Sequence, residues 1–102
     1  MILCFLTCAN VAEAEKIASA LLDKKLVVCA KLQDVKSRFL WKGNRESADE
    51  TLLIMESHES RFNLLEEEIR NLHSYEQFVL VGIPILHSAT GVEGWLKSEM
   101  GL

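Results

Sequence analysis

The chain has 102 residues, of which 49% are hydrophobic and 25% charged, with a single proline at Pro84. This composition excludes a disordered or collagen-like chain. Eleven basic residues against fifteen acidic ones give a net charge of −4, which argues against a general nucleic-acid binder. No apolar run approaches the roughly 20 residues that a membrane span needs. We therefore expect one domain over residues 1–102 that has neither a nucleic-acid nor a membrane partner.

The first apolar stretch predicts a strand over Ile2–Thr7. Asn10 and Glu13 then have the spacing of a helix cap and its acidic partner. Apolar residues recur at helical spacing from there to about Lys25, so we expect an amphipathic helix whose polar face, Glu13 included, points to water.

A long hairpin is predicted next. Leu26–Leu32 and Val35–Trp41 both have strand character, and their combined length predicts a bend or bulge near Asp34. The segment Lys42-Gly43-Asn44 is the expected turn, and Thr51–Glu56 is the expected third strand.

The last part of the chain predicts a second helix, a fourth strand and a terminal helix. Ser57 or Ser60 is the expected cap of the second helix, and Gln77–Leu86 is the expected strand. Thr90 and Glu93 have the spacing of a capping box that opens the terminal helix. The apolar stripe of the second helix consists of Phe62, Leu65, Ile69 and Leu72.

The order β-α-β-β-α-β followed by a helix predicts an α+β, ferredoxin-like sandwich with helices on one face of an antiparallel sheet. Apolar residues occupy both alternating sets of positions in three of the strands, where a half-exposed sheet would alternate apolar with polar. The second sheet face therefore needs a cover, and another copy of the chain is the simplest one. We expect an oligomer.

Five segments together resemble the CutA family of divalent-cation tolerance proteins. They are AEAEKIASALLDKKLVVCAKL, S-x-F-x-W-K-G at Ser37–Gly43, E-T-L-L at Glu50–Leu53, H-S-Y-E at His73–Glu76 and the terminal Trp95-Leu96. The resemblance covers nearly the whole chain and implies a tight homotrimer, similar in architecture to the PII signalling proteins, with sheets lining its interior.

The chain departs from the family pattern at several positions. Ser74 replaces a proline, and Phe78-Val79 replaces a Pro-Glu pair, which removes an acidic residue near the family's proposed ligand site. Phe39 stands for a tyrosine, and Glu56 stands for a lysine at the end of the third strand. These changes leave the ferredoxin-like fold implied by the resemblance in place. They weaken the implication that the chain keeps the family's ligand site.

The residues suggest one metal set. Cys29 stands at the family's characteristic cysteine position, and with His73 and Glu76 it would offer thiolate, imidazole and carboxylate ligands that suit copper or another divalent ion. The alternatives are that Cys29 is a small buried hydrophobe and that His73 caps its helix. Cys4 and Cys8, four apart along a strand, are interpreted as core residues.

A second group of residues is assigned to inter-subunit contacts. Aromatic side chains at a hairpin tip or at a cleft either bind a ligand or interlock with a neighbouring subunit. This group consists of Ser37, Phe39, Trp41, Tyr75 and Trp95.

The leading hypothesis is a CutA-like homotrimer, not an enzyme, that serves divalent-cation tolerance and binds copper or a similar ion. The alternative is a PII-like signalling module that binds a small molecule or protein between subunits. Catalysis is disfavoured because Cys29 with His73 is the only nucleophile–base pair worth naming. Three cysteines without a basic leader segment favour free thiols in the cytoplasm.

Overall fold

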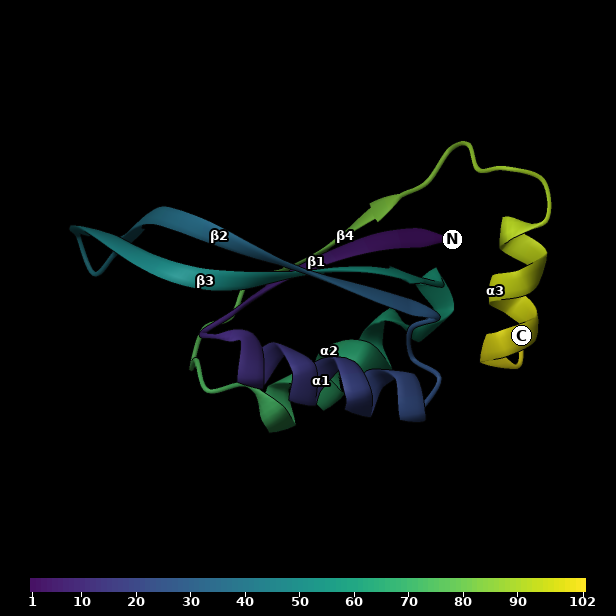
Figure 1. The fold of residues 1–102 in the computed structure, drawn as a ribbon, viewed down its shortest axis with the longest axis horizontal. Coiled ribbons are helices and arrows are strands. Elements are labelled where there is room, and N and C mark those ends of the chain that lie inside the picture. Colours follow the sequence, from purple (N-terminus) through teal and green to yellow (C-terminus); the bar gives the residue numbers. More distant parts are fainter.

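The computed structural model describes all residues 1–102, with four strands, three α-helices and a short 3-10 turn (Figure 1). The elements are β1 (Ile2–Cys8), α1 (Val11–Asp23), β2 (Cys29–Trp41), β3 (Asn44–Ser57), η1 (Glu59–Arg61), α2 (Phe62–Leu72), β4 (Leu80–Pro84) and α3 (Val92–Met100). No helix is long and apolar enough to cross a membrane.

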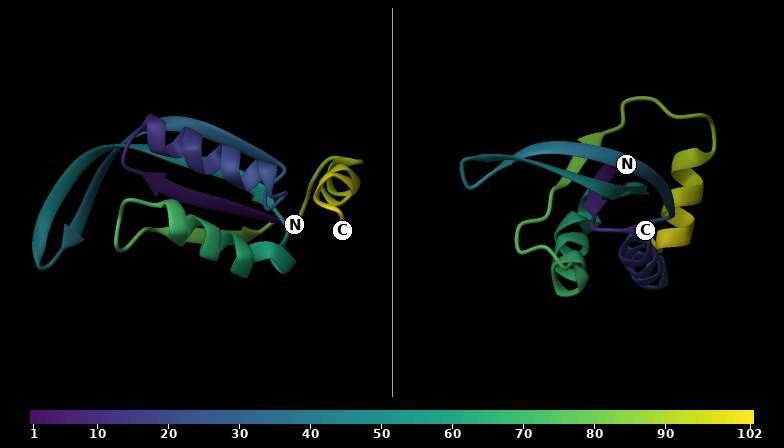
Figure 2. Two further views of the ribbon diagram at one scale, coloured as in Figure 1. Left: turned by 90° about the horizontal axis from the view of Figure 1, so that it is seen from below. Right: turned by 60° about the vertical axis from the view of Figure 1, so that its left-hand side comes forward.

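The strands form one antiparallel sheet in the order β2-β3-β1-β4. Both α1 and α2 lie against the same face of this sheet, while α3 stands beyond its end (Figures 1 and 2). This is the arrangement of a ferredoxin-like sandwich with an added C-terminal helix, so the predicted fold class is confirmed.

The core lies between the sheet and the two helices. Alternate residues of β1 are buried, and α1 contributes its apolar stripe to the same cluster. Val11 and Leu22, at the two ends of that helix, remain exposed. The fully buried side chains of the core include Leu6, Ile17, Leu21, Leu53, Met55, Leu65 and Ile69.

Strands β2 and β3 extend well past the rest of the sheet as a two-stranded arm (Figure 1). Their pairing runs without interruption from Cys29–Glu56 to Trp41–Asn44, so the bulge expected near Asp34 is wrong. The strand instead curves gradually along its length, as Figure 2 shows. The predicted turn is confirmed, with positive φ angles of 51° at Lys42 and 81° at Gly43.

Several predicted boundaries are corrected by the pairing. The third strand starts at Asn44 rather than Thr51, because the arm pairs all the way to its tip. The second strand starts at Cys29, since Leu26 and Val27 are already buried in the core before the pairing begins. The fourth strand is only Leu80–Pro84, the part that pairs with β1.

Two of the predicted helix caps are wrong. Neither Ser57 nor Ser60 caps α2; the Ser57 hydroxyl donates to the Leu26 carbonyl at 2.6 Å, and His58 caps the 3-10 turn that leads into the helix. The predicted Thr90–Glu93 capping box is absent as well. The residue before α3 is Gly91, whose φ of 93° needs a glycine, and it offers no side-chain cap.

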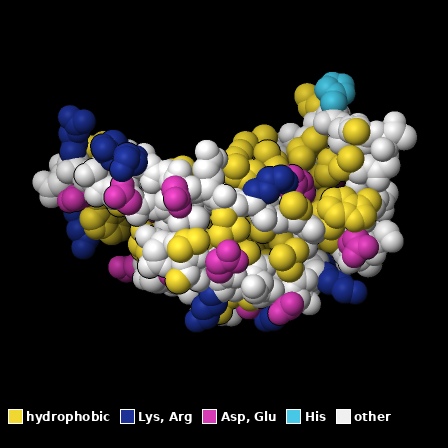
Figure 3. All heavy atoms as spheres, in the orientation of Figure 1, with side chains coloured by type: hydrophobic (Ala, Val, Ile, Leu, Met, Phe, Trp, Pro, Cys, Tyr) yellow, Lys and Arg dark blue, Asp and Glu magenta, His cyan; other side chains and the backbone are white.

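The sheet face away from the helices is hydrophobic and uncovered, as the two-sided strand pattern predicts. Val81 and Ile83 are 44% and 46% exposed, and the side chains beside them on the neighbouring strands are only half-buried. In Figure 3 a broad hydrophobic area lies over this part of the sheet. We call it the outer face, defined by Leu3, Phe5, Cys29, Lys31, Leu52, Ile54, Glu56, Val81 and Ile83.

Candidate functional site

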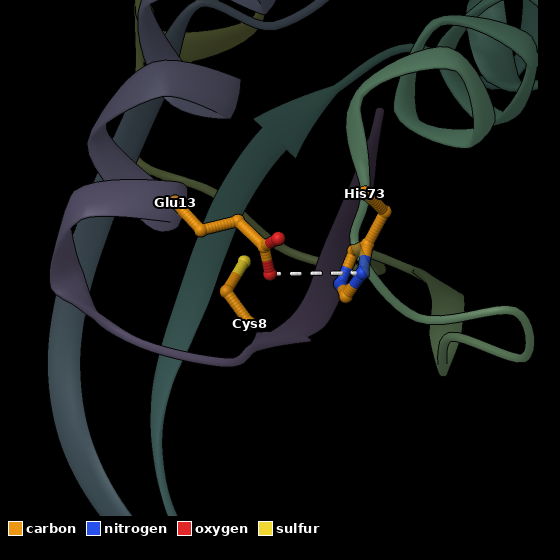
Figure 4. Close-up of side chains that lie close together, drawn as sticks. All are labelled: Cys8, Glu13 and His73. Atoms are coloured by element: carbon orange, nitrogen blue, oxygen red, sulfur yellow. Dashed lines mark ion pairs between the residues drawn. The ribbon is translucent and has the colours of Figure 1, made fainter.

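Three potential metal ligands meet where β1 ends and α2 ends. Cys8 is the last residue of β1, Glu13 lies in the first turn of α1, and His73 follows the last turn of α2. One ligand atom from each side chain lies within 4.8 Å of the other two. Figure 4 shows the thiol, the carboxylate and the imidazole turned toward one another. We call these residues the Cys8–Glu13–His73 cluster.

Glu13 is held in the cluster by the predicted capping arrangement. Its backbone N–H donates to Asn10 Oδ1 at 2.9 Å, which confirms Asn10 as the cap. Its carboxylate then accepts the backbone N–H groups of Ala9 and Ser74, each at 2.9 Å. The expectation that Glu13 faces water is therefore wrong, because these two donors draw the carboxylate inward between two loops.

The hydrogen bonds also affect the protonation of this carboxyl group. Burial alone would raise the pKa of Glu13, but the hydrogen bonds from Ala9 and Ser74 outweigh burial and lower it. Glu13 is therefore an anion at neutral pH.

His73 uses both ring nitrogens. Nε2 lies 2.8 Å from the Thr7 carbonyl oxygen and donates to it, while Nδ1 accepts the backbone N–H of Tyr75 at 3.0 Å. This bonding assigns a neutral ring with its proton on Nε2. Nδ1 lies 3.7 Å from Glu13 Oε1, and the side chain is fully buried. The backbone N–H of His73 also closes the last turn of α2, so the predicted capping position is confirmed.

Cys8 completes the cluster as a protonated thiol. It is fully buried, and that burial, together with the charges of Glu13 and Glu50, raises the pKa of Cys8 to about 12. Cys4 is also buried, which raises its pKa to about 11. Both residues pack in the core as predicted, and all three cysteines are free.

Tyr75 connects the cluster to the base of the arm. Its hydroxyl donates to Glu50 Oε2 at 3.1 Å, and Glu50 is itself buried. Burial and the hydrogen bond to Glu50 raise the pKa of Tyr75 to about 12. Tyr75 thus has a partner within its own chain, whatever it contacts in an assembly.

The predicted metal set is not brought together within one chain. Cys29 is paired with Glu56, which is paired with Leu3, whereas His73 bonds Thr7. Four residues of strand, roughly 13 Å, separate these two levels of the sheet. Glu76 is exposed and forms no hydrogen bond or ion pair.

The remaining predicted interface residues lie at the two ends of the molecule. Phe39 and Trp41 are 42% and 43% exposed near the tip of the arm, and Ser37 precedes them on the same strand. Trp95 is exposed on α3 at the opposite end. None of these side chains is buried in the core of its own chain.

Cys8 and Glu13 are the residues that sequence reasoning missed. They lie 65 and 60 residues before His73 along the chain, so no local pattern connects them to it. The predicted topology did contain a signal, because in a ferredoxin-like fold the C-terminal ends of β1 and α2 lie at the same end of the sheet. Reading the residues at that edge together would have placed Cys8 beside His73.

The comparisons with known proteins agree with this fold. The family model described as CutA1 divalent ion tolerance protein matches residues 2–99. The "Divalent-cation tolerance protein CutA" of Archaeoglobus fulgidus is 33% identical over 96 residues, covering 94% of each chain. A solved structure, described as the periplasmic divalent cation tolerance protein CutA from the same organism, has a TM-score of 0.95 at 31% identity. The alignment covers 98% of this chain and 99% of that one.

A longer relative is also similar. The "Protein CutA homolog" of Xenopus laevis is 33% identical over 82 residues, which are 79% of this chain and 54% of that protein. The chain thus shares its sequence pattern and its ferredoxin-like fold with a known class of protein, the divalent-cation tolerance proteins. This chain belongs to the CutA1 divalent ion tolerance family.

Proposed function

We propose that this protein serves divalent-cation tolerance as a homotrimer without enzymatic activity, and that it binds a divalent ion such as copper or zinc at the Cys8–Glu13–His73 cluster. One observation carries this proposal: thiol, carboxylate and imidazole ligand atoms converge within 4.8 Å of one another. The family match favours tolerance over a PII-like signalling role.

The donor set fits a borderline-soft ion. Sulfur, nitrogen and carboxylate oxygen are the ligands of zinc and copper sites in proteins, and three protein ligands leave one position for water. The hydrogen bonds that the ligand side chains form with other groups also fit a metal site. Nε2 of His73 donates to the Thr7 carbonyl, and Glu13 Oε2 accepts from Ser74, as is usual for ligands oriented by their surroundings.

Binding would compete with bonds that already exist. Nδ1 of His73 accepts the Tyr75 N–H, and its single lone pair must leave that donor to reach an ion. The Cys8 thiol must also release a proton, which its raised pKa opposes. Binding is therefore expected to be weak and to strengthen as the pH rises.

The same raised pKa supports the non-enzymatic part of the proposal. A cysteine nucleophile works as a thiolate, which needs a pKa lowered by a nearby positive charge. Cys8 has the opposite shift, and its neighbours Glu13 and Glu50 are acidic.

The homotrimer is supported by the uncovered outer face and by the family resemblance. An apolar sheet face of this kind is typical of an interaction surface. Light scattering should give about three times the 11.5 kDa chain mass. A monomer would refute this part of the proposal.

The metal set of Cys29, His73 and Glu76 remains a second possibility for the same function. Because Cys29 and His73 lie at different levels of the sheet, this set needs residues from adjacent subunits. Calorimetric titration of copper and zinc into the reduced protein separates the two sets. Cys8→Ser should abolish binding while Cys29→Ser leaves it unchanged; the reverse result assigns the site to Cys29, and no binding to the wild type refutes both.

We place the protein in the cytoplasm, because its three cysteines are free thiols and two of them are buried in the core. The archaeal relative is described as periplasmic, which makes the location testable. Fractionation of cells that express the natural gene should find the protein with cytoplasmic markers; recovery from the periplasm would contradict this placement.

A further inference from the structure

The Cys8–Glu13–His73 cluster is enclosed, so an ion needs a route to reach it. The side chains of Cys8 and His73 are fully buried, and that of Glu13 is only 12% exposed. A cavity of about 470 Å³ lies between the start of α1 and the base of the β2–β3 arm. The arm leaves the sheet at this end of α1 (Figure 1). The cavity is therefore at the end of the molecule that holds the cluster.

The cavity and the cluster share a wall. Ala9 lines the cavity, and its backbone N–H donates to Glu13 Oε1 at 2.9 Å. Thr51 also lines the cavity and is directly opposite Cys8 in the pairing of β1 with β3. A single layer of residues thus separates the cavity from two of the three potential ligands.

The lining of the cavity is acidic. It contains three acidic side chains and one lysine. Asp49 forms an ion pair with Lys36 at 3.1 Å, so these two charges offset each other. Asp34, on the exposed side of β2, forms no ion pair, and Glu50 has no basic partner either. Two uncompensated negative charges raise the local concentration of cations.

Glu50 has an oxygen that its own chain leaves unbonded. The residue is only 8% exposed, and its Oε2 accepts the Tyr75 hydroxyl. Its Oε1 has no donor, yet it is not sealed in, because Glu56 Oε2 is the only fully enclosed side-chain oxygen without a partner. Since Glu50 lines the cavity, Oε1 is open to it. Carboxylate oxygens of this kind are ligands for divalent cations.

Tyr75 joins Glu50 to the ligand atom of His73. The Tyr75 hydroxyl donates to Glu50 Oε2 at 3.1 Å, and the Tyr75 backbone N–H donates to His73 Nδ1 at 3.0 Å. The ring centroids of His73 and Tyr75 are 4.8 Å apart. The N–H occupies the one lone pair that Nδ1 can offer to an ion. Tyr75 therefore blocks the ligand nitrogen, and Glu50 holds Tyr75 in place.

A cation at Glu50 would disturb this arrangement, because a divalent ion can bind both oxygens of a carboxylate and then competes with a hydrogen-bond donor. We propose that a divalent ion enters through the cavity, is received by Glu50 Oε1 and displaces the Tyr75 hydroxyl, which frees His73 Nδ1. The ion then passes to the cluster, and the Tyr75–Glu50 bond forms again behind it. This inference rests on the proposed metal site and assigns its entrance, with Glu50 as the receiving carboxylate and Tyr75 as the gate.

The two ends of this one hydrogen bond should affect the binding rate in opposite directions. Stopped-flow mixing with zinc at neutral pH, with a pH indicator for the proton lost by Cys8, gives the association rate, and a chelator chase gives the dissociation rate. Glu50→Gln keeps an acceptor for Tyr75 but removes the receiving charge, so association should slow about tenfold. Tyr75→Phe removes only the hydroxyl that holds the gate, so association and dissociation should both become about threefold faster. A purely structural hydrogen bond would shift both variants in the same direction.

The location of the entrance has its own test. Asp34→Lys places a positive charge at the cavity and should slow association about fivefold in about 0.02 M salt, an effect largely screened at about 0.5 M. The matched control is Asp23→Lys, at an exposed position at the other end of α1, which makes the same change in net charge. Its association rate should stay within about twofold of the wild type.

Different results overturn the two proposals. No saturable zinc binding to the wild type refutes the metal site itself. Saturable binding that is lost in Cys8→Ser but has equal rates in Asp34→Lys and Asp23→Lys leaves the site standing and overturns the entrance. A Glu50→Gln variant that binds as fast as the wild type, or a Tyr75→Phe variant that binds more slowly, overturns it too. If Glu50→Gln loses its native circular dichroism, the two exposed aspartate variants decide.

Discussion

The Glu13 side chain connects three segments of the chain. Its removal should therefore destabilise the fold more than is usual for a residue in the first turn of a helix. Its carboxylate accepts N–H groups from Ala9, in the loop before α1, and from Ser74, in the loop after α2. A hydrogen bond to a charged group contributes about 1.5–3 kcal/mol. Two such bonds would sum to 3–6 kcal/mol, but the freed N–H groups can gain water, so the low end applies. We predict that Glu13→Ala lowers the free energy of unfolding by about 3 kcal/mol.

The measurement is urea denaturation at neutral pH and one fixed protein concentration, because an oligomer's stability depends on concentration. Glu13→Gln keeps one acceptor oxygen and should lose about half as much. Glu15→Ala, an exposed residue of the same helix, is the control and should change the value by less than about 0.5 kcal/mol. If Glu13→Ala is no less stable than Glu15→Ala, the carboxylate does not join these loops.

The pH dependence of this contribution has a defined sign. The pKa of Glu13 is lower in the folded chain than in the unfolded one. Its stabilisation is therefore complete above the unfolded value, about 4.3, and is lost as the pH falls through the folded pKa. The difference in stability between the wild type and Glu13→Gln should shrink below pH 4; a difference that persists unchanged at pH 2 would contradict the assignment.

Three further predictions follow from other contacts. Tyr75→Phe removes the donor to the buried Glu50 and should lower the free energy of unfolding, measured by urea denaturation, by about 1–3 kcal/mol. The control Phe39→Leu, on the exposed arm, should leave the folding of the single chain unchanged. Equal effects of the two variants would show that the Tyr75–Glu50 hydrogen bond does not stabilise the fold. Because burial raises the pKa of Cys4 to about 11 and that of Cys8 to about 12, a thiol reagent at pH 8 should label these two residues only on unfolding. Rapid labelling of Cys4 and Cys8 in the native protein would argue against this core. Leu53→Ala, at a fully buried position of β3, should destabilise the chain by about 3–5 kcal/mol, and a loss below about 1 kcal/mol would place that residue outside the core.

Much of the fold could be predicted because its periodic patterns are strong. The apolar spacing of α1 and α2 and the two-sided strands depend on burial alone, and they fixed the element order and the uncovered face. The boundaries were harder. Nothing near Asp34 shows that β2 would pair without a bulge, since that depends on its whole length matching β3. Helix α2 starts only after a 3-10 turn, because His58, rather than Ser57 or Ser60, is the capping residue there.

The site was predicted less well, because its residues meet through topology. His73 was identified, but its companions were sought in Cys29 and Glu76 rather than in Cys8 and Glu13. Glu13 was read as a surface residue from its helical position, which is correct for an isolated helix. The N–H of Ser74, brought there by the loop after α2, draws it inward, and no pattern around Glu13 encodes that encounter.

The measurement that tests the proposed site most directly is the number of protons released per bound ion, obtained by titrating zinc at pH 7 in buffers of different ionisation enthalpy. Glu13 is already ionised and His73 is neutral, so only the Cys8 thiol has a proton to lose. About one proton per ion should be released by the wild type and by Cys29→Ser, and Cys8→Ser should show no saturable binding. Binding that releases no proton, or that survives in Cys8→Ser, would show that the cluster is not where the ion is held.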